Sequence, residues 1–196
     1  ARPSIADPFL PKKIEDGKID EIRECIGCNI CVVGDELSVP IRCTQNPTMG
    51  EEYRRGWHPD RILPKNSEEP ILIVGSGPSG LECAMALGDR GYDVTLAESG
   101  KETGGHIANA ARLPGLSAWG RVRDYRMTRI EKMSNVQLYL ESDLESSEIL
   151  EYGCSRIVLA TGSKWRKDGI ARENHEPIPG LENLLVLTAD DLFADV

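Results

Sequence analysis

A short apolar run followed at once by three spaced glycines constrains the fold of this chain more than any other feature. Residues 71–74 read Ile-Leu-Ile-Val, and a Gly-x-Gly-x-x-Gly loop runs from Gly75 to Gly80 before a helix-like segment. Glycines at these positions permit a tight turn, the approach of a pyrophosphate to the backbone, and close packing of helix on strand. The pattern predicts a strand, a turn and a helix whose N-terminus faces phosphates. The predicted phosphate-binding residues are Gly75, Gly77, Pro78, Ser79 and Gly80.

Further apolar runs alternate with helix-like segments. The predicted strands are 71–74, 93–98, 136–140 and 156–160, and the predicted helices are 81–90, 119–133 and 146–152. Strands that alternate with helices form βαβ units and a parallel sheet. The fold class is therefore α/β, with a Rossmann-like dinucleotide-binding domain, and the uniformly apolar run at 156–160 is expected to be a fully buried strand.

An acidic residue closes the second predicted strand. Glu98 lies 18 positions after Gly80, where a carboxylate can accept hydrogen bonds from ribose hydroxyls and repel a 2′-phosphate. We place Glu98 and the adjacent Ser99 in the nucleotide site. The alternative is that Glu98 is only a solvated strand end.

Two more glycine-containing segments belong with this loop. Gly105 and His106 follow the second strand, and Thr161 and Gly162 follow the fourth. Glycine lets a backbone come close to a bound nucleotide. We interpret His106 as a positioned polar residue rather than a catalyst, because no nucleophile or second acid is indicated beside it.

Four of the six cysteines fall within a short stretch, at Cys25, Cys28, Cys31 and Cys43. Three thiolates at i, i+3 and i+6 with one remote partner suit a 4Fe-4S cluster. A structural zinc ion usually takes two separated pairs of ligands, so zinc is the weaker interpretation, and four unligated cysteines is weaker still. Gly27 and Asn29 suit a tight loop with amides directed at sulfur. The remaining cysteines, Cys83 and Cys154, are expected to be core thiols.

The composition excludes several classes of function. The chain of 196 residues has a formal net charge of −9, whereas binding to nucleic acid requires clustered basic side chains. No apolar run approaches the roughly 20 residues of a membrane span. The first residues lack the features of an export signal, so a soluble, cytoplasmic protein is expected.

The segments that flank the cysteines are rich in proline. Prolines at 3, 8 and 11 exclude a long helix before Lys12 and suggest an extended arm with little structure of its own. Several glycines and prolines between Cys43 and Pro70 indicate a linker of turns.

Together these segments resemble the trimethylamine, dimethylamine and histamine dehydrogenases, iron–sulfur flavoproteins related to old yellow enzyme and 2,4-dienoyl-CoA reductase. The resemblance covers nearly the whole chain. Besides the glycine loop, it rests on residues 25–31, 43–47, 50–59, 104–106, 113–116, 123–126 and 177–180.

The resemblance implies a place for this chain in the middle of a larger enzyme. Residues 1–24 resemble the tail of a (β/α)8 barrel that holds FMN and oxidises the amine. Residues 25–69 would then hold the 4Fe-4S cluster and a linker, and residues 70–183 would form the first half of a domain that binds ADP or FAD. Residues 184–196 resemble the crossover into a second nucleotide-binding-like domain.

The resemblance also implies a function. The whole enzyme would oxidise a small amine at FMN and pass electrons through the cluster to an electron-transferring flavoprotein, and it would form a homodimer. This chain alone would not turn over amines, since the catalytic residues would lie in the barrel. The alternatives are part of an NAD(P)H-dependent FAD, FMN and 4Fe-4S enoyl reductase, or a stand-alone redox carrier.

Overall fold

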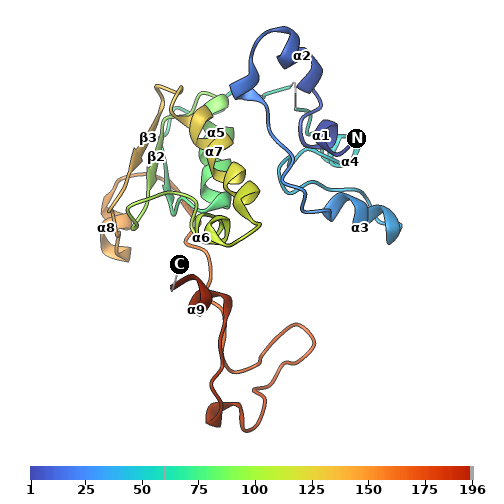
Figure 1. Ribbon diagram of the computed structural model, residues 1–196. Coiled ribbons are helices and arrows are strands. Elements are labelled where there is room, and N and C mark those ends of the chain that lie inside the picture. Colours follow the sequence, from blue (N-terminus) through green and yellow to red (C-terminus); the bar gives the residue numbers. More distant parts are fainter. Residues whose placement is uncertain (60, 195–196) are drawn as a thin grey trace.

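The computed structural model describes residues 1–59 and 61–194, and its centre is a four-stranded parallel sheet (Figure 1). The strands stand in the order β3-β2-β1-β4. The parallel α/β sheet predicted from the alternation of strands and helices is confirmed. The strand bounds are Ile71–Val74 for β1, Val94–Ala97 for β2, Val136–Tyr139 for β3 and Arg156–Leu159 for β4.

Strand β1 is the most buried element of the sheet. It pairs in register with β2 on one side and β4 on the other, so that Ile71 lies opposite both Val94 and Arg156. All four of its residues are buried. A strand with neighbours on both edges and side chains covered on both faces is expected to be uniformly apolar, as this one is.

Helices cover the two faces of the sheet unequally. One face packs Ile71 and Ile73 against residues of α5 and α7, including Leu81 and Ile130. The other face buries a smaller cluster around Leu72, against which Ile149 of α8 packs. In Figure 1, α5 and α7 lie side by side along the sheet. The bounds are Pro78–Asp89 for α5, Arg121–Ile130 for α7 and Ser146–Glu151 for α8.

The expectation that residues 156–160 form a fully buried strand is wrong. In β4, Arg156 and Leu159 are exposed, and the two residues between them are only half-buried. The reason is the position of the strand, because β4 has β1 on one side and no described strand on the other. A uniformly apolar run indicates that a strand is suited to burial. Whether the strand is buried depends on the strands and helices that lie beside it in the fold.

The N-terminal segment is more ordered than an extended arm, which corrects the sequence-based expectation. It forms α1, α2 and the 3-10 turn η1. Pro3 and Pro11 each lie in the first turn of a helix, where a missing N–H costs nothing, so these prolines start short helices while excluding a long one. The bounds are Arg2–Ala6 for α1, Leu10–Glu15 for α2 and Ile19–Glu21 for η1.

Several short elements differ from the predicted helices. They are α3 at Ile30–Glu36, α4 at Glu52–Arg55, α6 at His106–Arg112, the 3-10 turns η2 at Ser117–Gly120 and η3 at Leu181–Asn183, and α9 at Ala189–Ala194. The turn η2 occupies the start of the helix predicted from residue 119, so α7 begins at Arg121 instead. All of these elements are seven residues or shorter, a length at which periodicity carries little signal.

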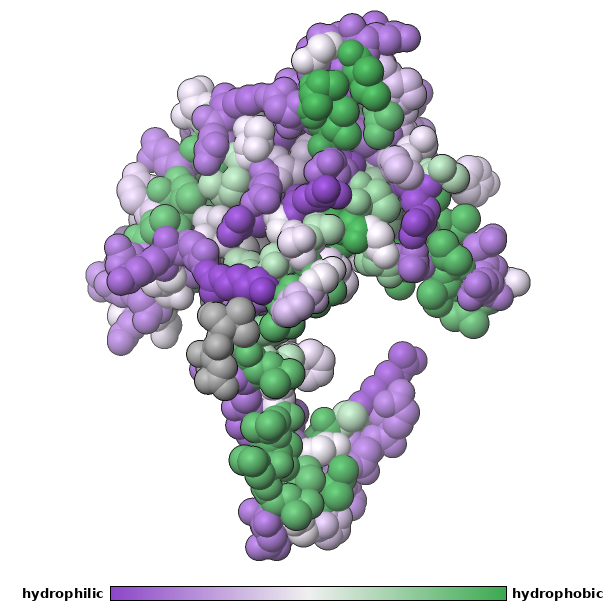
Figure 2. Space-filling view, in the orientation of Figure 1, coloured by the Kyte–Doolittle hydropathy of each residue, from purple (hydrophilic) through white to green (hydrophobic). Residues whose placement is uncertain are grey.

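The C-terminal part leaves the sheet as a long irregular excursion and returns through α9 (Figure 1). The return is fixed at α6, where His106 Nδ1 lies 3.3 Å from Asp190 Oδ1. Leu184, Leu185 and Leu187 are exposed on this excursion, on which Figure 2 shows both green and purple surface. No helix in the described part of the chain is long and apolar enough to cross a membrane.

Candidate functional site

Two glycines of the loop after β1 are required by packing. Gly75 has a φ of +101°, and a Cβ added there would lie 2.4 Å from the carbonyl oxygen of Ala160. A Cβ on Gly80 would lie 1.9 Å from the carbonyl oxygen of Gly75. Both distances are far inside van der Waals contact. The loop after β1 and the residue after β4 therefore touch through backbone, which only glycine allows.

Gly77 has a different environment, because no atom lies within 4 Å of the position where its Cβ would stand. It is the N-cap of α5, followed by Pro78 at the first helical position, and no side chain caps the helix. The early amides of a helix lack partners within the helix. The backbone around Gly77 and Ser79 is therefore open and rich in unclaimed N–H donors, which suits a phosphate.

Glu98 binds the glycine loop itself. Its Oε2 accepts hydrogen bonds from the Ser76 amide at 2.8 Å and the Ser76 hydroxyl at 2.6 Å, and its Oε1 accepts from the Gly100 amide at 2.8 Å. Partial burial favours the protonated carboxyl, but these hydrogen bonds outweigh burial and hold the pKa of Glu98 below its ordinary value. Glu98 is thus not a solvated strand end, the alternative that the sequence left open.

The hydrogen bonds of Glu98 define how it could meet a ribose. A carboxylate offers about four lone-pair positions. Ser76 occupies both on Oε2, Gly100 occupies one on Oε1, and the hydroxyl of the exposed Ser99 makes a long contact of 3.5 Å with Oε1. A ribose hydroxyl that donates to Oε1 would replace this Ser99 contact. The assignment of Glu98 and Ser99 to nucleotide binding remains a prediction with this geometry in its support.

The other predicted nucleotide residues gather at the same end of the sheet. The Gly104 amide donates to the carbonyl of Ser76 at 2.9 Å, and a Cβ on Gly105 would lie 3.4 Å from the Cα of Gly77. His106 Nε2 lies 2.8 Å from the carbonyl oxygen of Ser163. Through this contact His106 holds the exposed segment that contains Thr161 and Gly162 near the loop.

The place where these segments meet follows from the strand order. In an open parallel sheet, ligands bind outside the carboxyl ends of the strands, where the strand order reverses. Here the order reverses between β1 and β4. Gly75 follows β1 and Thr161 follows shortly after β4, so the glycine loop lies at this switch point.

The four clustered cysteines lie in a segment of turns beside the sheet domain. Cys31 is buried in the first turn of α3, and Cys25, Cys28 and Cys43 are half-buried. Gly27 and Asn29 have left-handed backbones, with φ of +70° and +59°. These residues reverse the chain on either side of Cys28, so that three cysteines are presented within one compact loop.

Backbone amides of this segment are aimed at sulfur. The Gly27 amide donates to Cys25 Sγ at 3.4 Å, and the Gln45 amide donates to Cys43 Sγ at 3.3 Å. The hydroxyl of Thr44 lies 3.1 Å from Cys28 Sγ, which joins the loop to the fourth cysteine. Such donors stabilise negative charge on a thiolate ligand and tune the potential of an iron–sulfur centre.

All four clustered cysteines are free thiols. Among residues 1–59 and 61–194, no group of three His, Cys, Asp or Glu side chains is placed to hold a single metal ion. The choice of a 4Fe-4S cluster over zinc stays a prediction from the spacing of the cysteines.

The other two cysteines pack against the core. Cys83 contacts the larger hydrophobic cluster and Cys154 the smaller one. Burial raises the pKa of both thiols, which keeps them protonated at neutral pH. This agrees with the interpretation of both as core thiols.

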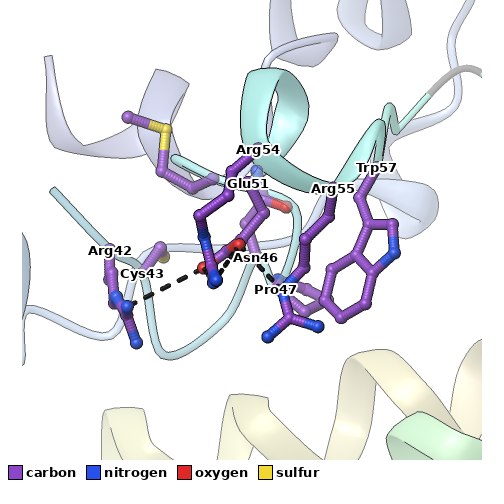
Figure 3. Close-up of a pocket in the computed structure, with 9 residues that line it drawn as sticks. Arg42, Cys43, Asn46, Pro47, Glu51, Arg54, Arg55 and Trp57 are labelled. Atoms are coloured by element: carbon purple, nitrogen blue, oxygen red, sulfur yellow. Dashed lines mark hydrogen bonds and ion pairs between the residues drawn. The ribbon is translucent and has the colours of Figure 1, made fainter. Parts of the chain in front are cut away.

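A basic cavity of about 280 Å³ opens beside Cys43 (Figure 3). The side chains of Arg42, Arg54 and Arg55 surround the carboxylate of Glu51 from three sides. The hydrogen bond from Arg54 holds the pKa of Glu51 below its ordinary value, so the carboxylate stays charged. Three cations around one anion leave this surface positive in a chain whose net charge is −9.

Sequence reasoning missed two buried polar residues that contact this site. Gln45 has 1% of its surface exposed and Arg126 has 3%. Arg126 Nη1 donates to Gln45 Oε1 at 2.9 Å, across the boundary between the cysteine segment and α7. Both residues lie in segments on which the family resemblance rests. Gln45 lies in an irregular segment, Arg126 is a charged residue on α7, and neither gives an apolar periodic signal of burial.

These features define a class of protein: a Rossmann-like α/β domain with a cysteine-rich segment attached. A family model described as "NAD(P)-binding Rossmann-like domain" matches residues 73–141. This match covers the glycine loop, Glu98 and the first three strands.

Closer relatives match nearly the whole chain. It is 50% identical to dimethylamine dehydrogenase of Hyphomicrobium sp. (strain x) over 98% of its own length and 27% of the relative's. The solved histamine dehydrogenase from Rhizobium sp. 4-9 superposes with a TM-score of 0.94 at 54% identity, over 100% of this chain and 30% of that one. The chain belongs to the family of these dehydrogenases and spans less than a third of their length.

A more distant structure is that of a 2-naphthoyl-CoA reductase in complex with 2-naphthoyl-CoA. It matches with a TM-score of 0.83 at 31% identity, over 100% of this chain and 28% of that one. A similar segment therefore occurs in proteins named as amine dehydrogenases and in one named as a 2-naphthoyl-CoA reductase.

Proposed function

We propose that this chain is the electron-relay and ADP-binding part of an amine dehydrogenase. The whole enzyme oxidises a small amine at FMN, in a part of the protein that this chain does not contain. Cys25, Cys28, Cys31 and Cys43 hold a 4Fe-4S cluster, through which electrons pass to an electron-transferring flavoprotein. The observation that carries this proposal is the set of amide donors aimed at Cys25 and Cys43, in a chain 50% identical to dimethylamine dehydrogenase.

The cluster, when bound, supplies one-electron steps. The residues of the chain set the conditions for those steps. The Gly27 and Gln45 amides stabilise negative charge on the thiolates, and the buried Cys31 anchors its loop away from water. The positive surface at Arg42, Arg54 and Arg55 favours an acidic acceptor near Cys43.

The glycine loop would serve binding and structure rather than chemistry. The open backbone at Gly77 and the N-terminus of α5 would hold the diphosphate, and Glu98 would accept a hydrogen bond from the ribose. Following the resemblance to the amine dehydrogenases, the bound nucleotide is proposed to be ADP in a structural role.

Rapid mixing of the full-length protein with an amine tests the proposal. Under anaerobic conditions, dimethylamine or histamine should bleach the flavin absorbance first and then give the EPR signal of a reduced 4Fe-4S cluster. Purified electron-transferring flavoprotein should then reoxidise the cluster. Absence of iron and sulfide, or stoichiometric zinc, would refute the proposal.

A reductase is the second candidate, favoured by the NAD(P)-binding description of the family model and by the reductase structure. In that case the glycine loop would hold FAD, and NADH or NADPH would reduce the protein. Mass spectrometry of the nucleotide released on denaturation separates the candidates, because the amine dehydrogenase proposal expects ADP. Released FAD, with reduction by NADPH and none by amines, would favour the reductase.

A further inference from the structure

Gln45 is buried, with 1% of its surface exposed, and its polar groups all have hydrogen-bond partners. Its side-chain Nε2 donates to the carbonyl of Glu24 at 3.0 Å, and its Oε1 accepts from Arg126. Its backbone amide donates to Cys43 Sγ, and its backbone carbonyl accepts from Arg23 and Arg126. A buried amide with every group partnered has one orientation, since any other leaves polar atoms unpaired.

These contacts join the two ends of the cysteine segment. Glu24 immediately precedes Cys25, and Gln45 lies two residues after Cys43. The hydrogen bond from Gln45 to Glu24 therefore sets the distance between the chain at the first cysteine and the chain at the fourth. These two cysteines are far apart in sequence, so their spacing must be fixed by a contact of this kind.

The same network reaches the nucleotide-binding domain. Arg126 comes from α7, donates through Nε to Glu82 of α5 at 2.7 Å, and is 3% exposed. Burial lowers the pKa of Arg126, and the adjacent Glu82 opposes that shift. A buried guanidinium with carboxylate and amide partners keeps its charge. A fixed positive charge therefore contacts Gln45, whose amide donates to Cys43 Sγ.

We infer that Gln45 and Arg126 are positioning residues for the iron–sulfur centre: Gln45 fixes the spacing of Cys25 and Cys43, and Arg126 locks Gln45 and stabilises the reduced cluster by its charge. The inference rests on the proposed function, because it presumes that the four cysteines bind a cluster. Net charge and hydrogen bonds to sulfur are established determinants of cluster potential. Partners beyond the ligands typically change metal affinity by roughly 10–100-fold.

The chain offers a matched control for Arg126. Arg129 lies on the same helix and pairs with Asp89 of the same partner helix α5, and both ion pairs have an N···O distance of 2.7 Å. Arg126→Gln and Arg129→Gln therefore each remove one cation and one ion pair between α5 and α7. Of these two arginines of α7, only Arg126 contacts Gln45.

The experiment compares full-length wild type, Arg126→Gln, Arg126→Lys and Arg129→Gln. Three quantities are measured: the midpoint potential of the cluster by EPR-monitored titration, the EPR line shape, and the rate of iron loss to a chelator. Arg126→Gln should lower the potential, alter the line shape and release iron about tenfold faster or more. Arg126→Lys should keep the potential near that of wild type and still release iron faster, because a lysine keeps the charge but lacks the planar fork.

The possible outcomes separate this inference from the proposed function. Wild-type protein without iron and sulfide would refute the proposed function. A cluster in wild type, with Arg126→Gln and Arg129→Gln indistinguishable in all three quantities, would overturn the positioning role alone. If Arg126→Gln does not fold, as judged by circular dichroism, Arg126→Lys decides, and iron loss at the rate of Arg129→Gln would overturn the inference.

Discussion

The sheet domain and the cysteine segment are held together by different forces. In the sheet domain, β1 is buried along its whole length, and helices pack on both faces. Between Cys25 and Cys43, only Ile26, Cys31 and Gly34 are buried, while Val32 and Val33 on α3 are exposed. The first region folds by removing apolar surface from water. The second depends on polar contacts, left-handed turns and whatever its four thiols bind.

This difference teaches where each region is vulnerable. A packed core fails when a side chain does not fit, because its neighbours have no room to move. A segment with few buried residues fails when its cross-links are lost, since its hydrophobic stabilisation is small. Substitutions in one region should therefore leave the other intact.

The largest effect is expected at Gly80. In Gly80→Ala the new Cβ would stand 1.9 Å from the carbonyl oxygen of Gly75, a backbone atom that cannot move without disrupting the loop. We expect a loss of about 3 kcal/mol in the free energy of unfolding. Urea denaturation monitored by circular dichroism measures it. A loss below about 0.5 kcal/mol would show that the helix does not pack as described.

Replacement of Cys43, the fourth cysteine, should abolish iron binding in the cysteine segment and leave the sheet domain intact. Cys43→Ser removes one of four predicted ligands, so bound iron should fall to near zero while the affinity for ADP stays within about twofold of wild type. Colorimetric iron analysis and isothermal titration calorimetry give these two values. The control is Cys154→Ser, which alters a thiol that packs on the sheet and should retain full iron.

Gly77 tests the nucleotide site without disturbing the fold. Its Cβ position is open in the protein, so Gly77→Ala should fold normally. The added methyl group would meet the pyrophosphate, and ADP affinity should drop about tenfold or more, roughly 1.4 kcal/mol. Equilibrium dialysis with radiolabelled ADP measures it, and iron content serves as the internal control. Unchanged affinity would refute the placement of the phosphates.

The smallest effect is expected at Glu98. Because folding lowers the pKa of Glu98 from its ordinary value of 4.5, its charged form stabilises the folded state above that pH, and the stabilisation is lost as the pH falls through the folded pKa. Glu98→Gln should cost about 1 kcal/mol at pH 7, a modest value for a partly exposed carboxylate. The difference from wild type should shrink below about pH 4.5. Thermal unfolding across pH 3.5–7 measures it. A constant difference at every pH would exclude the charge as its cause.

The sequence predicted the sheet domain well, because its elements follow from local pattern. The run at residues 71–74 and the glycine spacing identify β1, the turn and α5 without reference to distant parts of the chain. The exposure of β4 was not predictable, since it depends on which strands lie beside it. Glu98 was placed at the loop, but its bonds to Ser76 depend on how the loop after β1 meets the end of β2.

For the cysteine segment, the cluster-binding chemistry stays a prediction, and most of its structure was not predictable. The spacing of the four cysteines indicates their role, and Gly27 and Asn29 adopt the left-handed turns that their residue types favour. The contact between Gln45 and Arg126 joins residues 81 positions apart. No local pattern encodes such a pairing.

Hydrogen exchange with and without the cluster tests the central claim, that packing holds one region and ligation the other. Full-length protein would be compared before and after anaerobic removal of iron with a chelator, and exchange would be followed peptide by peptide by mass spectrometry. We predict that residues 25–43 lose their protection when the iron is removed, while β1, α5 and β2 exchange as slowly as before. Equal protection of residues 25–43 in both states, or loss of protection throughout the sheet, would contradict the claim.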